Sequence, residues 1–229
     1  MQNNITKTPV WNNDIALCAA DLLLDTGSYL VDFDREYKDW YVWKSGIVAP
    51  SYCNCRYINT SAQASQQIAT FLKTIVNCNF SEADVVVGLA TAGIPWANRV
   101  ADSLSKPMSF VRSAPKSYGV GGTVECSPSQ NSRAVIIDDL CASGGSLVKA
   151  IQNLSDEKGI TTIGVVTIVN WGFEAMYSKL NTLNIPILCV TSYPQIITSA
   201  QNKGVINSSQ ADKLLKFYQS PSTFDWSSL

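Results

Sequence analysis

The stretch AVIIDDLCASGGS, residues 134–146, decides the fold. Four apolar residues lead into two adjacent carboxylates, Asp138 and Asp139, and small residues fill positions 142–146. In open parallel sheets, ligands bind outside the carboxyl ends of the strands, where loops can reach them. The pattern therefore predicts a buried strand ending at the acids, a ligand-binding loop, and a helix that begins near Gly144.

The same stretch has the residue types that bind a sugar phosphate. Backbone N–H groups in a small-residue loop can surround a phosphate, and the following helix N-terminus adds partial positive charge. Asp138 and Asp139 would repel a phosphate, so they need another partner, such as sugar hydroxyls or hydroxyl-bound Mg²⁺. A sugar phosphate satisfies both requirements. The alternative is an ordinary strand-to-helix turn in which Asp139 lies near a helix cap.

Outward from this stretch, short apolar runs alternate with amphipathic ones, which is typical of an α/β fold with a mostly parallel sheet flanked by helices. Five buried strands are predicted at 84–88, 108–112, 134–138, 163–169 and 185–190. Helices are predicted at 14–25, 61–77, 93–104, 144–157, 173–182, 195–202 and 208–218. Strand-like segments at 40–44 and 51–57 would form a small N-terminal hood over the ligand edge.

We expect a single domain over residues 1–229. Its N-terminal helices and hood would take 1–80, the core 81–192, and C-terminal helices 193–229. Residues 113–132 hold few bulky aliphatic side chains and four Gly or Pro positions in their first ten, which predicts a long mobile loop.

Composition excludes several function classes. The 229 residues include 17 basic and 18 acidic side chains and no histidine, so histidine catalysis is impossible and no global charge favours nucleic acid or an anionic membrane.

Seven cysteines without dense spacing fit a reducing compartment. Cys53-x-Cys55 could be a metal or redox element, but a zinc site lacks its second ligand pair. No signal-peptide core or membrane-spanning run is evident, so a soluble, cytoplasmic protein is expected.

Two nucleotide-binding classes are disfavoured by missing motifs. The chain has no Gly-x₄-Gly-Lys-Ser/Thr, which a P-loop NTPase needs to hold its phosphates. It also has no Gly-x-Gly-x-x-Gly opening a first helix, as a dinucleotide-binding fold would.

Residues 134–146 resemble the phosphoribosyl-pyrophosphate (PRPP) signature of the type I phosphoribosyltransferases. Three further segments are similar to those of the orotate phosphoribosyltransferase family, and together they cover most of residues 14–190. Lys44-Ser-Gly with 50–56 (PSYCNCR) resembles its Lys-Ser-Gly and Ser-Pro-Tyr segment, 87–95 (VGLATAGIP) its pyrophosphate-binding turn, and 112–122 (RSAPKSYGVGG) its flexible catalytic loop.

The resemblance implies a role for each matching residue. Asp138 and Asp139 would meet the ribose hydroxyls, and Asp139 and Lys116 would be the catalytic residues. The 5′-phosphate would be held by Ala142, Ser143, Gly144, Gly145 and Ser146, and the pyrophosphate by Thr91, Ala92 and Gly93 with the cations Lys44, Arg112 and Lys116. The base would lie beside Tyr52, Cys53, Ala142 and Trp171.

The resemblance also implies Mg²⁺ as cofactor, bound through PRPP, with Asp138 and Asp139 as its only candidate direct ligands. It implies PRPP and a nucleobase, orotate by overall similarity, as substrates. A homodimer is expected, in which the loop 113–132 acts across the interface. No nucleic-acid or membrane partner is expected.

Departures from the family pattern concentrate in the loop and at the base end. Ser113 stands where the family has a second basic residue, Tyr118 where it has histidine, and Val120 where it has an acid. Ala142 replaces a threonine, and Trp171 replaces the arginine that binds the orotate carboxylate. Two alternatives therefore stay open: transfer to a different base, or a PRPP-binding regulator without catalysis. Lys44 and Lys116 could also be surface cations, and Tyr52 and Trp171 ordinary packing.

Overall fold

The computed structural model describes residues 10–43, 45–115, 121–125 and 129–226. In these residues a six-stranded sheet has the order β10-β9-β8-β5-β6-β7. Its strands are β5 (Val85–Leu89), β6 (Met108–Val111), β7 (Val124–Glu125), β8 (Arg133–Cys141), β9 (Thr161–Asn170) and β10 (Ile187–Ser192). All neighbours run parallel except β7, which is antiparallel to β6.

The five predicted strands are confirmed, and the sheet has a sixth strand that was not predicted. β7 lies inside 113–132, where a loop was expected throughout. Val124 pairs with Val111 and is buried, and its backbone N–H donates to the carboxylate of Glu157 at 3.1 Å. These contacts order a two-residue strand that is too short to show in the sequence pattern. Residues 116–120 and 126–128 of that segment lie outside the described residues.

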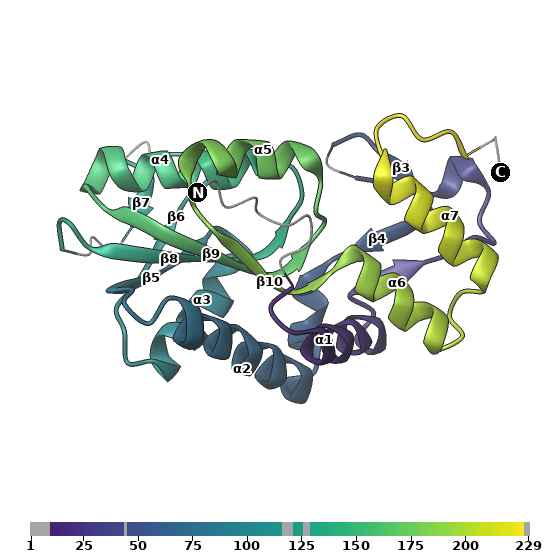
Figure 1. Ribbon diagram of the computed structural model, residues 1–229, viewed down its shortest axis with the longest axis horizontal. Coiled ribbons are helices and arrows are strands. Elements are labelled where there is room, and N and C mark those ends of the chain that lie inside the picture. Colours follow the sequence, from purple (N-terminus) through teal and green to yellow (C-terminus); the bar gives the residue numbers. More distant parts are fainter. Residues whose placement is uncertain (1–9, 44, 116–120, 126–128, 227–229) are drawn as a thin grey trace.

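Helices cover both faces of the sheet, as Figure 1 shows. The helices α4 (Gly145–Lys158) and α5 (Glu174–Leu183) lie on one face, and α1 (Asn13–Asp25), α2 (Ala62–Asn79) and α3 (Gly93–Ser103) on the other. The helices α6 (Tyr193–Asn202) and α7 (Ser208–Gln219) pack beside the hood at one end. The seven predicted helices are confirmed to within two residues at each end.

Side chains alternate between two hydrophobic clusters along the central strands. Val86 and Ile137 point toward α1, α2 and α3, whereas Val87 and Ile136 point toward α4 and α5. Because both faces are covered, both sets are fully buried, and the strands read as continuous apolar runs. None of the helices in the described ranges is long and apolar enough to cross a membrane.

The hood consists of two small antiparallel sheets with short 3₁₀ helices. β1 (Tyr29–Val31) pairs with β4 (Ser51–Cys53), and β2 (Tyr41–Val42) pairs with β3 (Val48–Ala49). A short turn η1 (Tyr37–Asp39) precedes β2, and η2 (Cys55–Thr60) follows β4. The strand-like prediction for 51–57 is therefore wrong beyond Cys53.

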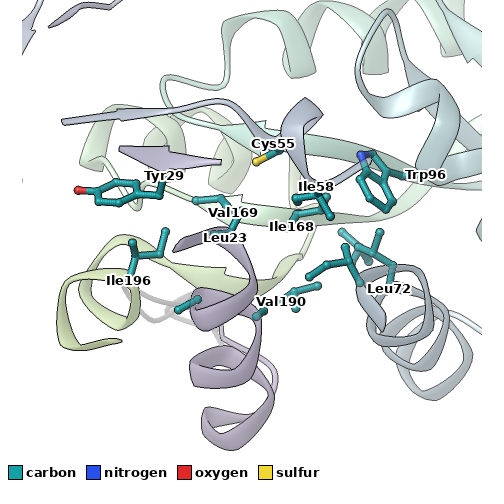
Figure 2. Packing of buried hydrophobic residues seen from close by; sticks show 14 of the residues in the cluster. Leu23, Tyr29, Cys55, Ile58, Leu72, Trp96, Ile168, Val169, Val190 and Ile196 are labelled. Carbon is teal, nitrogen blue, oxygen red and sulfur yellow. The ribbon is translucent and has the colours of Figure 1, made fainter. Parts of the chain in front are cut away.

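The turn to η2 has a local cause. The side chain of Asn54 accepts a hydrogen bond from the backbone N–H of Arg56 at 3.3 Å, which ends the strand and starts the helical turn. η2 then buries Cys55 and Ile58 in the same cluster as Leu72 and Trp96, as Figure 2 shows. This packing attaches the hood to the core.

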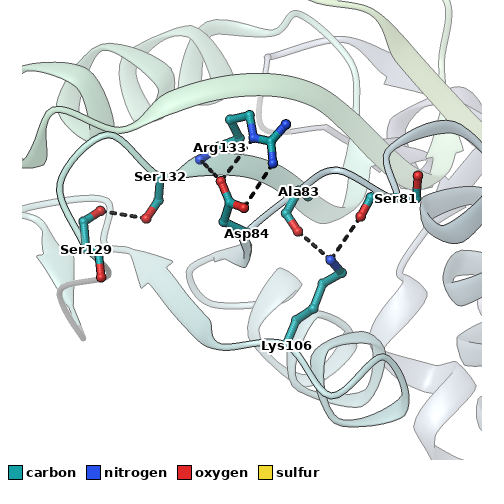
Figure 3. A network of polar contacts seen from close by, with 7 residues as sticks. All are labelled: Ser81, Ala83, Asp84, Lys106, Ser129, Ser132 and Arg133. Carbon is teal, nitrogen blue, oxygen red and sulfur yellow. Dashed lines mark hydrogen bonds and ion pairs between the residues drawn. The ribbon is translucent and has the colours of Figure 1, made fainter.

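A polar network fixes the other end of the central strands, seen in Figure 3. The carboxylate of Asp84, just before β5, accepts from Nε and Nη2 of Arg133 at 3.1 Å each, and from its backbone N–H at 2.9 Å. These bonds lower the pKa of Asp84 to about 2. Lys106 donates nearby to the carbonyls of Ser81 and Ala83. Because the Asp84–Arg133 pair is exposed, its main effect is to align β5 with β8.

Gly164 generates a prediction about the core. It follows a shift of register between β8 and β9, and a Cβ built there would overlap the ring of Phe80. We expect Gly164→Ala to lower the free energy of unfolding by about 1–3 kcal/mol through overpacking, measured by urea unfolding. In a Phe80→Leu background the same substitution should cost less. Equal costs in the two backgrounds would contradict the ring contact as the cause.

Candidate functional site

The site lies at the point where the sheet changes winding direction. β5 leads through α3 to β6 on one side, and its other neighbour β8 leads through α4 to β9 on the opposite side. The connections after two adjacent parallel strands thus diverge and leave a crevice at their carboxyl ends. This topology brings the predicted pyrophosphate turn, 91–93, beside the predicted sugar and phosphate segment, 138–146.

Close packing of α3 on β8 joins the two segments. A Cβ at Gly93 would lie 2.5 Å from the carbonyl oxygen of Ile137 and 3.3 Å from Oδ1 of Asp138, so this approach requires glycine. The preceding Ala90–Thr91 peptide bond is cis, and Thr91 is exposed. The structure therefore brings Thr91, Ala92 and Gly93 next to the acid pair.

The acid pair lies within β8, which continues to Cys141. The predicted strand end at Asp138 is therefore wrong, because Leu140 and Cys141 still pair with Val169 and Asn170 on β9. Each carboxylate accepts from the next backbone N–H: Asp138 from Asp139, and Asp139 from Leu140, both at 2.9 Å. These local bonds hold the two side chains in place.

Burial raises the pKa of both acids. Desolvation raises the pKa of Asp138 well above its usual 3.8, and the neighbouring charge of Asp139 raises it further. Desolvation also raises the pKa of Asp139, against the lowering effects of hydrogen bonds and of the positive charge of Arg56. Two neighbouring half-buried carboxyl groups are costly to ionise together, so the free protein is prepared for a ligand that supplies donors or positive charge.

Arg56 is a functional candidate that sequence reasoning missed. It lies on η2, is exposed, and takes part in none of the ion pairs between described residues. The preceding residue, Cys55, places its Sγ 3.8 Å from the carbonyl oxygen of Asp139, so η2 lies against the acid strand. One signal was available, because Arg56 is the only basic residue between Lys44 and Lys73.

The loop after β8 has the geometry of an anion site. Gly144 adopts a left-handed conformation, with φ 70°, as the residue before α4, and a Cβ there would lie 3.0 Å from Cγ of Met176. No side chain caps α4, so the amides of its first turn remain available for an acceptor. Ser143, Gly145 and Ser146 are exposed.

A second cation adjoins this loop and was also not predicted. Lys179 on α5 donates from Nζ to the carbonyl oxygen of Ser143 at 2.9 Å. It holds the loop backbone and places a positive charge beside it, which favours an anionic ligand.

Of the three cations predicted to bind the pyrophosphate, only Arg112 lies within the described residues. Arg112 follows β6 at the same edge of the sheet, its N–H donates to the Thr123 carbonyl at 2.9 Å, and its Nη1 lies 3.3 Å from Oε1 of Glu125 on β7. Its charge is thus partly compensated. Lys44 and Lys116 lie outside the described residues, as do Tyr118 and Val120.

Two of the predicted base neighbours lie on β4. The ring of Tyr52 is 37% exposed and stacks on Tyr41, with centroids 5.7 Å apart. Cys53 is half-buried, and its Sγ lies 3.8 Å from Sγ of Cys55. Through Cys55 this strand reaches the acid strand, so Cys53 is close to Asp139 while Tyr52 faces outward on the hood.

Trp171 is part of the core. Its side chain is 3% exposed and packs between Trp43 and Tyr193, with ring centroids 4.7 and 4.6 Å away. These contacts favour the packing interpretation over stacking on a base, because the faces of the indole are already occupied. Ala142 is half-buried and offers no hydroxyl at the position where the family has threonine.

The donor set of the acid pair fits Mg²⁺ only together with a ligand. Carboxylate oxygens are donors that Mg²⁺ prefers, and this ion commonly keeps several non-protein ligands, including water and substrate oxygens. Within the described ranges, no group of three or more His, Cys, Asp or Glu side chains could hold a metal ion. Asp138 and Asp139 would therefore share the ion with sugar and phosphate oxygens.

The chain is similar to known proteins over most of its length. Residues 57–182 match the model of the phosphoribosyl transferase domain. An orotate phosphoribosyltransferase of Halalkalibacterium halodurans is 37% identical over 82% of this chain and 89% of that protein. One of Cutibacterium acnes is 34% identical over 93% and 96%. The solved orotate phosphoribosyltransferase of Aeropyrum pernix superposes with a TM-score of 0.68 at 25% identity, over 82% of this chain and 99% of that one.

The buried acids generate a prediction about stability. Because folded Asp138 has a raised pKa, it retains a proton that the unfolded chain has lost, so its contribution to stability is greatest below its usual pKa of 3.8 and is lost as pH rises through the folded pKa. We expect Asp138→Asn to raise the free energy of unfolding at pH 7 by on the order of 1 kcal/mol, since it removes a buried charge. Thermal unfolding of both proteins between pH 4 and 8 should show curves that diverge with pH. Parallel curves would contradict a raised pKa.

Proposed function

Because this chain belongs to the orotate phosphoribosyltransferase family, we propose that it transfers the ribose 5-phosphate of PRPP to orotate, giving orotidine 5′-monophosphate and pyrophosphate. One observation supports this function above the others. Gly93, the acid pair and the uncapped N-terminus of α4 lie together at one switch point. Gly93 would serve the pyrophosphate, the acid pair the ribose, and the N-terminus of α4 the 5′-phosphate.

The protein's own residues mainly position PRPP. First-turn amides of α4 and residues 142–146 hold the 5′-phosphate, with Lys179 beside them. Asp138 and Asp139 accept hydrogen bonds from the ribose hydroxyls, while Thr91, Ala92 and Gly93 hold the pyrophosphate. Fixing both ends of the sugar lowers the entropy cost of bringing its C1 to the base nitrogen.

Charge stabilisation supplies the second part of the mechanism. As the bond from C1 to pyrophosphate breaks, the sugar gains positive charge and the leaving group negative charge. The acid pair stabilises the first, and Lys44, Arg112 and Lys116 the second. Mg²⁺, when bound with PRPP, would neutralise phosphate charge as a Lewis acid.

The base end needs a cation that Trp171 cannot provide. A desolvated carboxylate without a donor set is strongly disfavoured. Arg56 on η2 places a guanidinium beside the acid strand that forms no ion pair with another described residue, and guanidinium groups bind carboxylates in a bidentate manner. Arg56 thus takes the role of the family arginine, from the hood instead of from the sheet.

The family resemblance supports three further parts of the proposal. The protein would act as a homodimer, segment 113–132 would reach across the interface, and the location would be the cytoplasm. Sedimentation would test the first, and mixing a Lys116→Ala protein with a second, differently inactive variant would test the second by restored activity.

Pyrophosphate release from PRPP tests the activity itself. We expect Mg²⁺-dependent release with orotate and little release with neutral bases, because Arg56 favours an anionic base. Release with another base and not with orotate would show a different acceptor, which the absence of a cation at Trp171 favours. Binding of PRPP without release for any base would indicate a regulator.

Arg56→Ala tests the carboxylate contact. A hydrogen bond to a charged group contributes about 1.5–3 kcal/mol, so we expect the KM for orotate to rise about 10- to 100-fold with less change in the KM for PRPP. Arg35→Ala is the matched control, since Arg35 is also exposed on the hood but lies over the Tyr41 ring and pairs with Asp32. An equal rise for both substrates would show that Arg56 acts only on the acid pair.

A further inference from the structure

Cys53 and Cys55 form a close pair of thiols to which the proposed transfer mechanism gives no chemical step. Their Sγ atoms are 3.8 Å apart, and both thiols are free. Cys53 is the last residue of β4 and Cys55 the first of η2, and Asn54 between them caps η2. In a continuous strand, side chains two residues apart are separated by about 6.6 Å along the chain. The change of chain direction at Asn54 brings the two sulfurs closer than that.

The pair connects the two sides of the site. Cys55 is 1% exposed, lies in the cluster shown in Figure 2, and has its Sγ 3.8 Å from the carbonyl oxygen of Asp139. Cys53 is half-buried and follows Tyr52. A change in the bonding of these sulfurs would therefore act on the acid strand and on the hood strand together.

We propose that Cys53 and Cys55 are a peroxide-sensitive modification site, whose oxidation to a disulfide lowers turnover at the adjacent acid pair. The effect on turnover rests on the proposed function, whereas the formation of the disulfide does not. A disulfide needs its sulfurs about 2.05 Å apart, so the two sulfurs must approach each other. That movement pulls on Cys55 at its contact with Asp139 and on Cys53 at the end of β4.

The chemistry needs only a peroxide as oxidant. The sulfur of Cys53, the more exposed of the two, attacks a peroxide oxygen; the O–O bond breaks, and a sulfenic acid and water form. The sulfur of Cys55 then attacks the Cys53 sulfur, the S–O bond breaks, and a second water leaves with the Cys55 proton. Overall two thiols lose two protons and two electrons to one hydrogen peroxide, giving a disulfide and two waters, and a thiol reductant reverses the reaction.

The order of the steps follows from the environment of Cys55. Its side chain is 1% exposed, whereas that of Cys53 is half-buried, so a peroxide in solution reaches the sulfur of Cys53 first. Cys55 then acts as the resolving residue, because its sulfur already lies 3.8 Å from that of Cys53.

The sequence provides a clean chemical readout. Trypsin cleaves after Lys44 and Arg56, and the peptide 45–56, SGIVAPSYCNCR, contains both cysteines and no other. After hydrogen peroxide treatment of the full-length protein, we expect this peptide to be lighter by two hydrogens and to recover its mass with dithiothreitol. Turnover with PRPP and orotate should fall in parallel by about tenfold, the loss of one moderate contact, and recover with the mass.

Two variants separate this site from other thiols. Cys55→Ser should match the unsubstituted protein in reductant, show no mass loss, and keep its turnover at peroxide concentrations that inactivate the unsubstituted protein. Cys78→Ser, at an exposed position on α2, should remain as sensitive as the unsubstituted protein.

Three results would overturn the proposal. They are turnover lost while peptide 45–56 keeps both thiols, a crosslinked peptide with full turnover, and equal peroxide sensitivity of Cys55→Ser. If that variant does not fold, the peptide mass and turnover of the unsubstituted protein still decide between these results. Absence of transfer in fully reduced protein would contradict the proposed function instead, while the crosslink would still be measured by mass.

Discussion

The cost of burying two adjacent carboxyl groups at the edge of a parallel sheet is the constraint on which the rest of this structure depends. Asp138 and Asp139 lie half-buried in the strand that pairs with both β5 and β9, so the sheet fixes the position of their backbone. Desolvation raises the pKa of both acids, and for Asp139 the hydrogen bonds and the charge of Arg56 offset it only in part. The surrounding elements keep this edge ready for a polar ligand: Gly93 lets α3 approach, Gly144 turns the chain into α4, and η2 covers the hood side.

The sequence predicts the core well because each element has its own local signal. Buried parallel strands appear as short apolar runs, and helices as amphipathic runs between turn residues. The acid pair, the small-residue loop and the turn at 91–93 were therefore found at the correct edge of the sheet. Because β5 and β8 are adjacent and parallel, the segments that follow them meet at the same edge of the sheet.

The errors come from features that the pattern of apolar runs does not encode. β7 exists because Val124 pairs with Val111 on β6 and because Glu157, more than 30 residues away, accepts N–H groups of Thr123 and Val124. η2 replaces a strand because Asn54 bonds to a neighbouring amide and Ile58 finds a place in the core. At the base end, Trp171 belongs to an aromatic cluster with Trp43 and Tyr193, which a single sequence does not reveal. The positive charge near the acids accordingly comes from Arg56.

Calorimetric titration of the protein with PRPP and Mg²⁺, in two buffers of different ionisation enthalpy, tests the central claim most directly. If the acid pair binds the ribose with its pKa raised in the free state, ligand binding should ionise it and release protons. The account predicts that Asp138→Asn releases fewer protons and binds PRPP more weakly. Equal affinity and equal proton release in the two proteins would contradict it.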